Sequence, residues 1–263
     1  MDLKELRLTA GTVAARHPWE LARLIVVKDL LRKVNFRPGE KLRVVDMGSG
    51  DTFVIEQLLN AHPHWEAAAA VDIAFSDDDL QQLRTRFANE GKAIAVFRDM
   101  SHIPDGFQAD CILLLDVLEH IEDHEGFLQL LHTQPFIGAH TQLLVTVPAF
   151  QSLFSAHDVF IHHYRRYTRQ QLCRTLATNG WMPYRSGYFF FSLLGPRLIQ
   201  KWLGSRAGST QGIGAYKRGP LDELIAGVLK LDYRLGQALR TIGLRLPGLS
   251  TYAICRVQHP QGQ

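Results

Sequence analysis

Short aliphatic segments alternate with helical stretches along most of the chain, and this alternation constrains the fold more than any other feature of the sequence. The segments carry aliphatic residues on both faces, which is typical of parallel strands that helices cover on both sides. The expected strands are residues 41–46, 67–73, 93–97, 109–115, 142–147, 181–191 and 252–257, with helices such as 53–60 and 80–89 between them. The pattern predicts an α/β protein with a seven-stranded, mostly parallel sheet and helices on both faces.

Helical segments extend this core at two places. Apolar spacing after Pro18 predicts an N-terminal helix over residues 19–34, followed by turn residues at 37–40. Thr168 and Gln171 form a capping-box pair that opens a helix ending before Gly180. Residues 193–249 are expected to be a helical insertion before the last strand, with one or two amphipathic helices such as 221–242. We therefore expect one domain, divided into residues 1–40, 41–192, 193–249 and 250–258.

A glycine-rich turn follows the first expected strand. Gly48 and Gly50 let the backbone approach a ligand closely, and Asp72 comes 22 residues after Gly50, where a carboxylate can hold a ribose diol. A dinucleotide is the obvious competing ligand. However, Phe53 replaces the third small residue of that fingerprint, and Asp46 would repel a pyrophosphate but attract an amine. These residues disfavour NAD as the ligand.

Four segments in order along residues 42–187 resemble the motifs of class I S-adenosylmethionine-dependent methyltransferases. They are Asp46-Met-Gly-Ser-Gly50, Asp72, Arg98-Asp99-Met100 and Asp116-Val-Leu-Glu-His120. The resemblance implies a Rossmann-like sheet and S-adenosylmethionine as the cofactor. One departure is Thr52, where that family often has a third glycine.

The same resemblance implies a set of cofactor-binding residues. Asp46, Gly48, Ser49 and Gly50 would flank the methionine part of the cofactor. Asp72 would hold the ribose hydroxyls, and its neighbour Ile73 is also expected to contact the cofactor. Asp99 and Met100 would bind the adenine. Asp116 would face the methionine part or the acceptor.

The acceptor is expected to be a small molecule. No Asn/Asp-Pro-Pro-aromatic tetrad follows the fourth strand, which disfavours transfer to a base nitrogen and favours carbon or oxygen. The C-terminal region resembles that of bacterial methyltransferases of lipid-like and polyketide-like natural products, including the aryl polyene type. That resemblance implies a hydrophobic or aromatic acceptor that is tethered or membrane-associated. The alternative is a non-catalytic, cofactor-binding scaffold that docks a partner.

Several histidines could act as a base near the methyl donor. His157 and His163 are our first candidates, with Tyr164 as an orienting group and His120 as a third candidate base. The alternative is that the His-Asp and Arg-Arg-Tyr-Thr sequences only tie the loop to the next helix. No cysteine or close acidic ligand completes a metal site around His157, His162 and His163, so no metal is expected.

Charge is divided unevenly along the chain. Residues 1–159 contain 14 Lys and Arg against 23 Asp and Glu, a net of −9, whereas residues 160–263 contain 15 against 3, a net of +12. A positive surface suits an acidic acyl carrier protein or an anionic membrane, and nucleic acid is least favoured because no recognised binding module accompanies the charge. The aromatic segment 188–202 is either an interfacial helix or a strand followed by a lid helix.

Cysteine spacing and the N-terminus bear on location. The three cysteines have no paired or metal-type spacing, and the first ten residues lack the apolar region of a signal peptide. We expect a cytoplasmic protein, with peripheral attachment at the inner membrane face as the open alternative.

Overall fold

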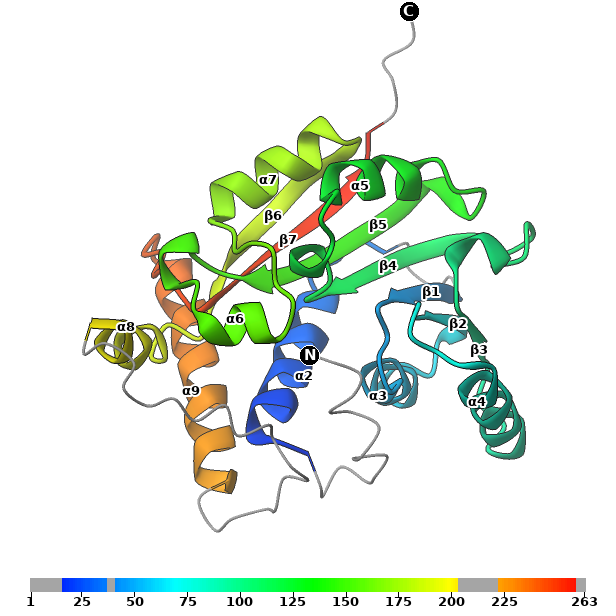
Figure 1. The fold of residues 1–263 in the computed structure, drawn as a ribbon, viewed down its shortest axis with the longest axis horizontal. Helices are drawn as coiled ribbons and strands as arrows, with labels where there is room; N and C mark the ends of the chain where they lie inside the picture. The colour runs from blue at the N-terminus through cyan, green and yellow to red at the C-terminus, as the bar shows by residue number, and fades with distance from the viewer. Residues whose placement is uncertain (1–15, 37–40, 203–221, 259–263) are drawn as a thin grey trace, which may run out of the picture.

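A seven-stranded sheet organises the described part of the chain, in the order β3-β2-β1-β4-β5-β7-β6 (Figure 1). This computed structural model describes residues 16–36, 41–202 and 222–258. The strands are β1 (Leu42–Met47), β2 (Trp65–Val71), β3 (Ile94–Phe97), β4 (Ala109–Leu115), β5 (Ile137–Pro148), β6 (Trp181–Phe189) and β7 (Ser250–Val257). Only β7 runs antiparallel to its neighbours in this sheet, β5 and β6. The predicted Rossmann-like, mostly parallel sheet is confirmed.

Helices cover both faces of this sheet. They are α2 (Pro18–Leu31), α3 (Phe53–Ala61), α4 (Asp77–Asn89), α5 (His124–His132), α6 (Ala156–Phe160), α7 (Arg169–Thr178), α8 (Leu194–Trp202) and α9 (Asp222–Thr241). One apolar layer contains side chains of α2, α3, α4 and α9, and the other contains side chains of α5 and α7. Neighbouring strand residues such as Val44 and Val45 belong to opposite layers, because side chains alternate across a strand.

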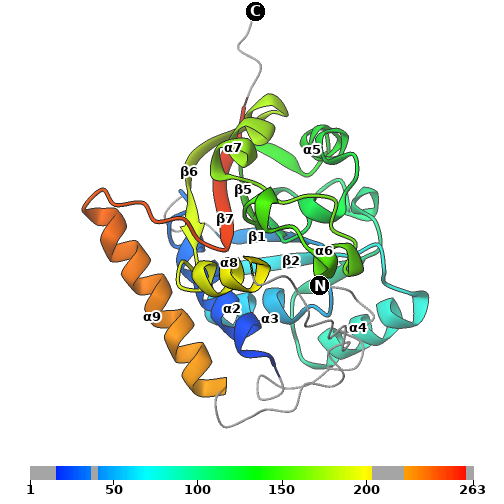
Figure 2. The ribbon, with the colours of Figure 1, turned by 60° about the vertical axis from the view of Figure 1, so that its left-hand side comes forward.

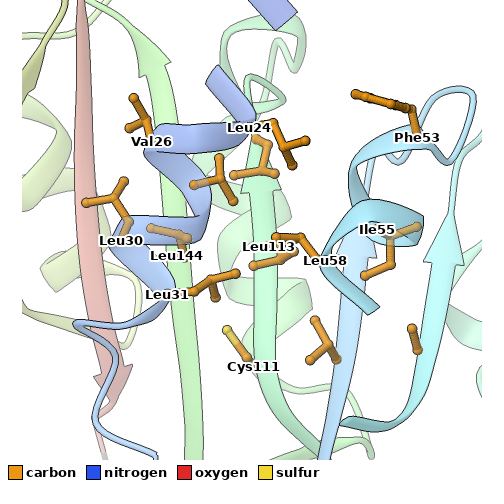
Figure 3. Packing of buried hydrophobic residues seen from close by; sticks show 14 of the residues in the cluster. Leu24, Val26, Leu30, Leu31, Phe53, Ile55, Leu58, Cys111, Leu113 and Leu144 are labelled. Carbon is orange, nitrogen blue, oxygen red and sulfur yellow. The ribbon is translucent and has the colours of Figure 1, made fainter. Parts of the chain in front are cut away.

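The layer beneath α2 and α3 shows how the first helices pack on the sheet. Leu31 of α2 and Leu58 of α3 point toward Leu113 of β4, which lies between them (Figure 3). All three side chains are buried. Through this packing the N-terminal helix shares the apolar layer that covers one face of the sheet.

Most of the predicted boundaries agree with the structure, and the differences have local causes. The capping box is present: Thr168 accepts a hydrogen bond from the Gln171 amide, and Gln171 accepts one from the Thr168 amide. Strand β5 begins at Ile137, five residues before the predicted start. The prediction started late because residues 137–141 include glycine and polar side chains, which do not form an aliphatic pattern. The sixth strand ends at Phe189, two residues early, where Phe190 has a φ of 60°. The predicted turn at 37–40 and the start of the helix at 221 lie outside the described residues.

The helical insertion packs on the N-terminal helix. Helix α9 packs against α2 (Figure 2), and Lys33, two residues after α2, donates a hydrogen bond of 2.8 Å to Gln237 of α9. The buried carboxylate of Asp232 accepts hydrogen bonds from the amides of Phe191 and Ser192. These contacts join α9 to both α2 and the end of β6. Among the described residues, none of the helices combines the length and apolar character needed to cross a bilayer.

Candidate active site

A cavity of about 540 Å³ lies at the carboxyl ends of β1, β2, β3 and β4. Ligands of open α/β sheets bind at this edge, where loops from several parallel strands converge. All nine residues implied as cofactor-binding line it, namely Asp46, Gly48, Ser49, Gly50, Asp72, Ile73, Asp99, Met100 and Asp116. The structure therefore brings together residues that are up to 70 positions apart in the sequence.

The glycine-rich turn forms the floor of the cavity. Gly48 and Gly50 have φ angles of 72° and 57°, a region that favours glycine. A Cβ on Gly48 would lie 2.6 Å from a methyl carbon of Val117, so the turn leaves no room for a side chain there. The amides of Gly48 and Ser49 donate hydrogen bonds to the carbonyl of Val71, which ties the turn to β2.

The contacts of Thr52 account for a threonine where the family often has a third glycine. It has a φ of 67°, so a glycine would be favoured on backbone grounds, but its hydroxyl is fully buried and donates to the Asp51 carbonyl. The same hydroxyl lies 2.7 Å from a carboxylate oxygen of Glu56. These polar contacts stabilise a threonine in the strained position at the start of α3.

Asp72 and Ile73 form one wall. The carboxylate of Asp72 accepts hydrogen bonds from the amides of Gly50 at 2.9 Å and Ala74 at 3.0 Å, and burial raises its pKa. Each carboxylate oxygen retains acceptor capacity for a further donor. Ile73 is 84% exposed beside it and offers an apolar surface to a flat ligand.

Asp46 is buried at the end of β1. Burial raises its pKa to about 7, with Arg23 opposing the shift and the charges of Asp72 and Asp51 adding to it. A cationic ligand group would stabilise the ionised form of such a buried carboxyl group and lower its pKa. The position of Asp46 in the cavity wall makes it the natural partner of an ammonium group.

Helix α2 and the residue two positions before it contribute polar groups that the sequence analysis did not identify. Arg16, Glu20 and Arg23 line the cavity, and Arg23 forms an ion pair of 3.0 Å with Asp116. Arg16 pairs with Asp51 and stacks on the ring of Phe53. Arg16 lies two residues before α2, whereas Glu20 and Arg23 are three positions apart on one side of the helix, so the polar pair on α2 could have been recognised from its spacing.

At the end of β3, Asp99 and Met100 occupy another part of the lining. The Asp99 carboxylate accepts a 2.7 Å hydrogen bond from the Ser101 amide, and hydrogen bonding to Ser101 lowers its pKa. Asp99 is therefore an ionised acceptor at the cavity edge, next to the buried thioether of Met100.

Of the candidate catalytic residues, His120 lines the cavity and His157, His163 and Tyr164 do not. His120 lines the cavity and packs edge-on against His163, with ring centroids 4.5 Å apart. Burial lowers the pKa of His120 to about 4. His157 is exposed on α6 and Tyr164 is half exposed, and neither lines the cavity. His162, which the sequence analysis considered only as a metal ligand, does line it.

His163 belongs to a buried polar network behind the cavity wall. Its Nδ1 lies 3.0 Å from a carboxylate oxygen of Asp158, which also accepts a 2.8 Å hydrogen bond from Nε of Arg166. Burial opposes ionisation of Asp158, but these two hydrogen bonds outweigh it and hold its pKa well below the ordinary value. The network supports the structural interpretation of the His-Asp and Arg-Arg-Tyr-Thr sequences. Glu119, which the sequence analysis missed, is buried beside this network, and its Oε1 lies 3.9 Å from Nε2 of His163.

Comparison with known proteins bears on the fold. No protein-family model matches the chain, and no curated protein matches its sequence. Phosphoethanolamine N-methyltransferase 2 of Haemonchus contortus, solved with S-adenosyl-L-methionine, is similar with a TM-score of 0.54 and 13% identity, over 90% of this chain and 52% of that one. An apo mycolic acid cyclopropane synthase gives 0.53 and 12%, over 98% and 100% of the two chains.

A third solved structure shows how far this likeness reaches. The [4+2]-cyclase SpnF has a TM-score of 0.53 and 12% identity, over 94% of this chain and 84% of that one. The chain therefore has the fold of class I S-adenosylmethionine-dependent methyltransferases. Because the fold is shared with a protein named as a cyclase, the residues of the cavity must carry the argument about function.

Proposed function

We propose that this chain transfers a methyl group from S-adenosylmethionine to carbon or oxygen of a small hydrophobic or aromatic acceptor. The observation that carries the proposal is the convergence of the glycine-rich turn and four carboxylates on one cavity at the carboxyl edge of the sheet. The carboxylates are those of Asp46, Asp72, Asp99 and Asp116. Their positions match the separate polar groups of the cofactor better than they match a pyrophosphate.

The residues present fit this cofactor. The ionised form of Asp46 would bind the amino group of the methionine part, and the closed turn at Gly48 leaves backbone rather than side chain at the ligand surface. Asp72 would accept from the ribose hydroxyls. Ile73 and Met100 offer apolar contacts to the adenine, and Asp99 accepts at its edge. The cofactor supplies an electrophilic methyl group on a positively charged sulfur.

The remaining lining supports a hydrophobic acceptor. Beyond Asp116 the cavity is bordered by the apolar side chains of Ile121, Phe127, Leu130 and Ile161. His120 is the one of our three candidate bases that reaches the cavity. Its low pKa makes it a weak base, which favours an acceptor that is itself acidic, such as a phenol or an enol.

We further propose that the acceptor is presented at an anionic membrane, and the exposed side chains on the outer face of α9 support this. Exposed apolar side chains follow a helical stripe along α9 at Val228, Leu231 and Leu235, and exposed Ile242 comes directly after the helix. The exposed Lys230 and Arg234 lie beside this stripe, and exposed Leu198 and Ile199 lie on α8. Apolar side chains bordered by basic residues bind anionic lipid surfaces. An acyl carrier protein would use the charge but not the apolar stripe.

The experiment that tests the reaction is mass spectrometry after incubation with methyl-deuterated S-adenosylmethionine. The acceptors are a panel of hydrophobic phenols, enols and acyl thioesters, with and without anionic vesicles. We expect one labelled methyl group on at least one acceptor. Cofactor binding without labelling of any acceptor would instead favour the scaffold hypothesis.

A further inference from the structure

Three potential metal ligands meet at the edge of the cavity. Glu119 and His120 belong to a short 3-10 helix, Leu118–His120, directly after β4, and His163 follows α6. One ligand atom from each residue lies within 4.8 Å of the others. The sequence analysis found no acidic ligand near the histidines because Glu119 is 44 positions from His163.

Glu119 is the unexplained member of this cluster. Its side chain is fully buried, and neither carboxylate oxygen has a hydrogen-bond partner within the described residues. The Nε2 atom of His163 is 3.9 Å from Oε1, which is too far for a hydrogen bond. The nearby Arg23 is paired with Asp116. A buried carboxyl group without a partner is costly, so Glu119 must hold either a proton or a cation.

The two histidines are oriented as ligands. Asp158 is ionised and can only accept, so Nδ1 of His163 carries the hydrogen, and in the neutral ring the lone pair is on Nε2, facing Glu119. His120 hydrogen-bonds to the backbone of His162. Metal-binding histidines commonly donate their second ring nitrogen to a carboxylate or a carbonyl in this way, which fixes the ring and its tautomer.

We propose that Glu119, His120 and His163 bind one divalent metal ion of the Zn²⁺ type. Two imidazoles and one carboxylate suit Zn²⁺ and its first-row neighbours, and three protein ligands leave a coordination position open. His120 lines the cavity, so the site lies at its edge. Use of the metal to bind an acceptor oxygen and make it more acidic would replace the base role of His120 and rests on the proposed function, whereas metal binding itself does not.

The test is a titration of the full chain, stripped with a chelator and free of cofactor, with ZnCl₂ and CoCl₂. Calorimetry gives the stoichiometry, and the visible spectrum of Co²⁺ reports its ligands. We expect one ion per chain and Co²⁺ bands without a thiolate transition. Glu119→Gln and His163→Ala should each weaken binding by tenfold or more. His140→Ala, which removes an exposed histidine on β5, should leave binding unchanged.

Failure of this proposal is distinguishable from failure of the proposed function, because no cofactor is present. Absence of stoichiometric binding by the wild-type chain would overturn it, even if a variant fails to fold. Equal binding by the wild type and by a folded Glu119→Gln would also overturn it. Glu119 would then be a buried protonated acid, visible as a carboxylic C=O infrared band that Glu119→Gln removes.

Discussion

Arg23 and Asp116 join the N-terminal helix to the end of β4 through an ion pair of 3.0 Å. Both residues line the cavity, so α2 forms part of the candidate site. Asp116 has a φ of 57° and also accepts a hydrogen bond from Thr146, which holds its strained backbone in place. Arg23 lowers the pKa of the neighbouring Asp46 and so controls how much of that group is ionised.

Cofactor affinity should depend on pH through Asp46. Burial raises its pKa to about 7, so the group is ionised above pH 7 and progressively protonated below it. An ammonium group binds only the ionised form well, so affinity should fall by about tenfold per pH unit below pH 7 and level off above it. Calorimetry with S-adenosylhomocysteine between pH 5.5 and 8.5 measures this. Asp46→Asn should bind weakly at all these pH values, and an equally steep profile in that variant would contradict the assignment.

Replacing Arg23 should move this profile. In Arg23→Gln the positive charge that favours ionised Asp46 is lost, so the midpoint of the affinity profile should shift to higher pH. The loss of affinity relative to the wild-type chain should therefore be largest below pH 7 and should disappear toward pH 8.5. Arg43→Gln is the control, because Arg43 pairs with the partly exposed Glu66 away from the cavity. A uniform loss at every pH would indicate a structural effect of Arg23 instead.

Gly48→Ala should destabilise the fold through a steric clash as well as backbone strain. The added Cβ would lie 2.6 Å from Val117, and the φ of 72° is unfavourable for alanine. Gly91→Ala is a matched control with a φ of 63° and no atom within 4 Å of the new Cβ. We expect a loss of ~1 kcal/mol for Gly91→Ala, from strain alone. Overpacking adds a further ~1–3 kcal/mol for Gly48→Ala.

Urea unfolding measures both free energies. Adding Val117→Ala to Gly48→Ala should recover much of the difference between the two variants, because it removes the methyl carbons that the Cβ meets. Equal losses for Gly48→Ala and Gly91→Ala would show that the turn is not as closed as the structure describes.

The outer face of α9 should bind anionic membranes. Sedimentation with vesicles of phosphatidylglycerol should retain the wild-type chain, and vesicles of phosphatidylcholine should not. Leu231→Glu with Leu235→Glu should abolish retention by removing the apolar contact and adding charge. Gln81→Glu with Gln82→Glu adds the same charge on exposed positions of α4 and should retain binding. Equal retention of both double variants would exclude α9 as the membrane contact.

The fold could be predicted from local signals. Aliphatic runs predicted each strand to within a few residues, and the turn at Gly48 and Gly50 predicted the position of the cavity, because parallel strands bring their carboxyl ends to one edge. The first five residues of β5 were missed because they lack an aliphatic pattern, and of these five Ile137 alone pairs with β4, opposite Ala109.

The part of the cavity around Asp116 and the nearby His163 was less predictable. Arg23 and Asp116 are 93 positions apart, and Glu119 and His163 are 44 apart, so only the packing of the chain shows that they meet. His157 and His163 look equivalent as a pair of loop histidines. The structure separates them, because α6 turns His157 to the surface while Asp158 holds His163 inside.

The most direct test of the central claim is calorimetric titration of the wild-type chain and Asp72→Ala with S-adenosylhomocysteine at pH 8. Asp72 supports the turn through Gly50 and would hold the ribose. We predict 1:1 binding to the wild-type chain and a loss of at least tenfold in Asp72→Ala, with NAD giving no heat. Absence of binding to the wild-type chain, or unchanged binding in a folded Asp72→Ala, would contradict the account.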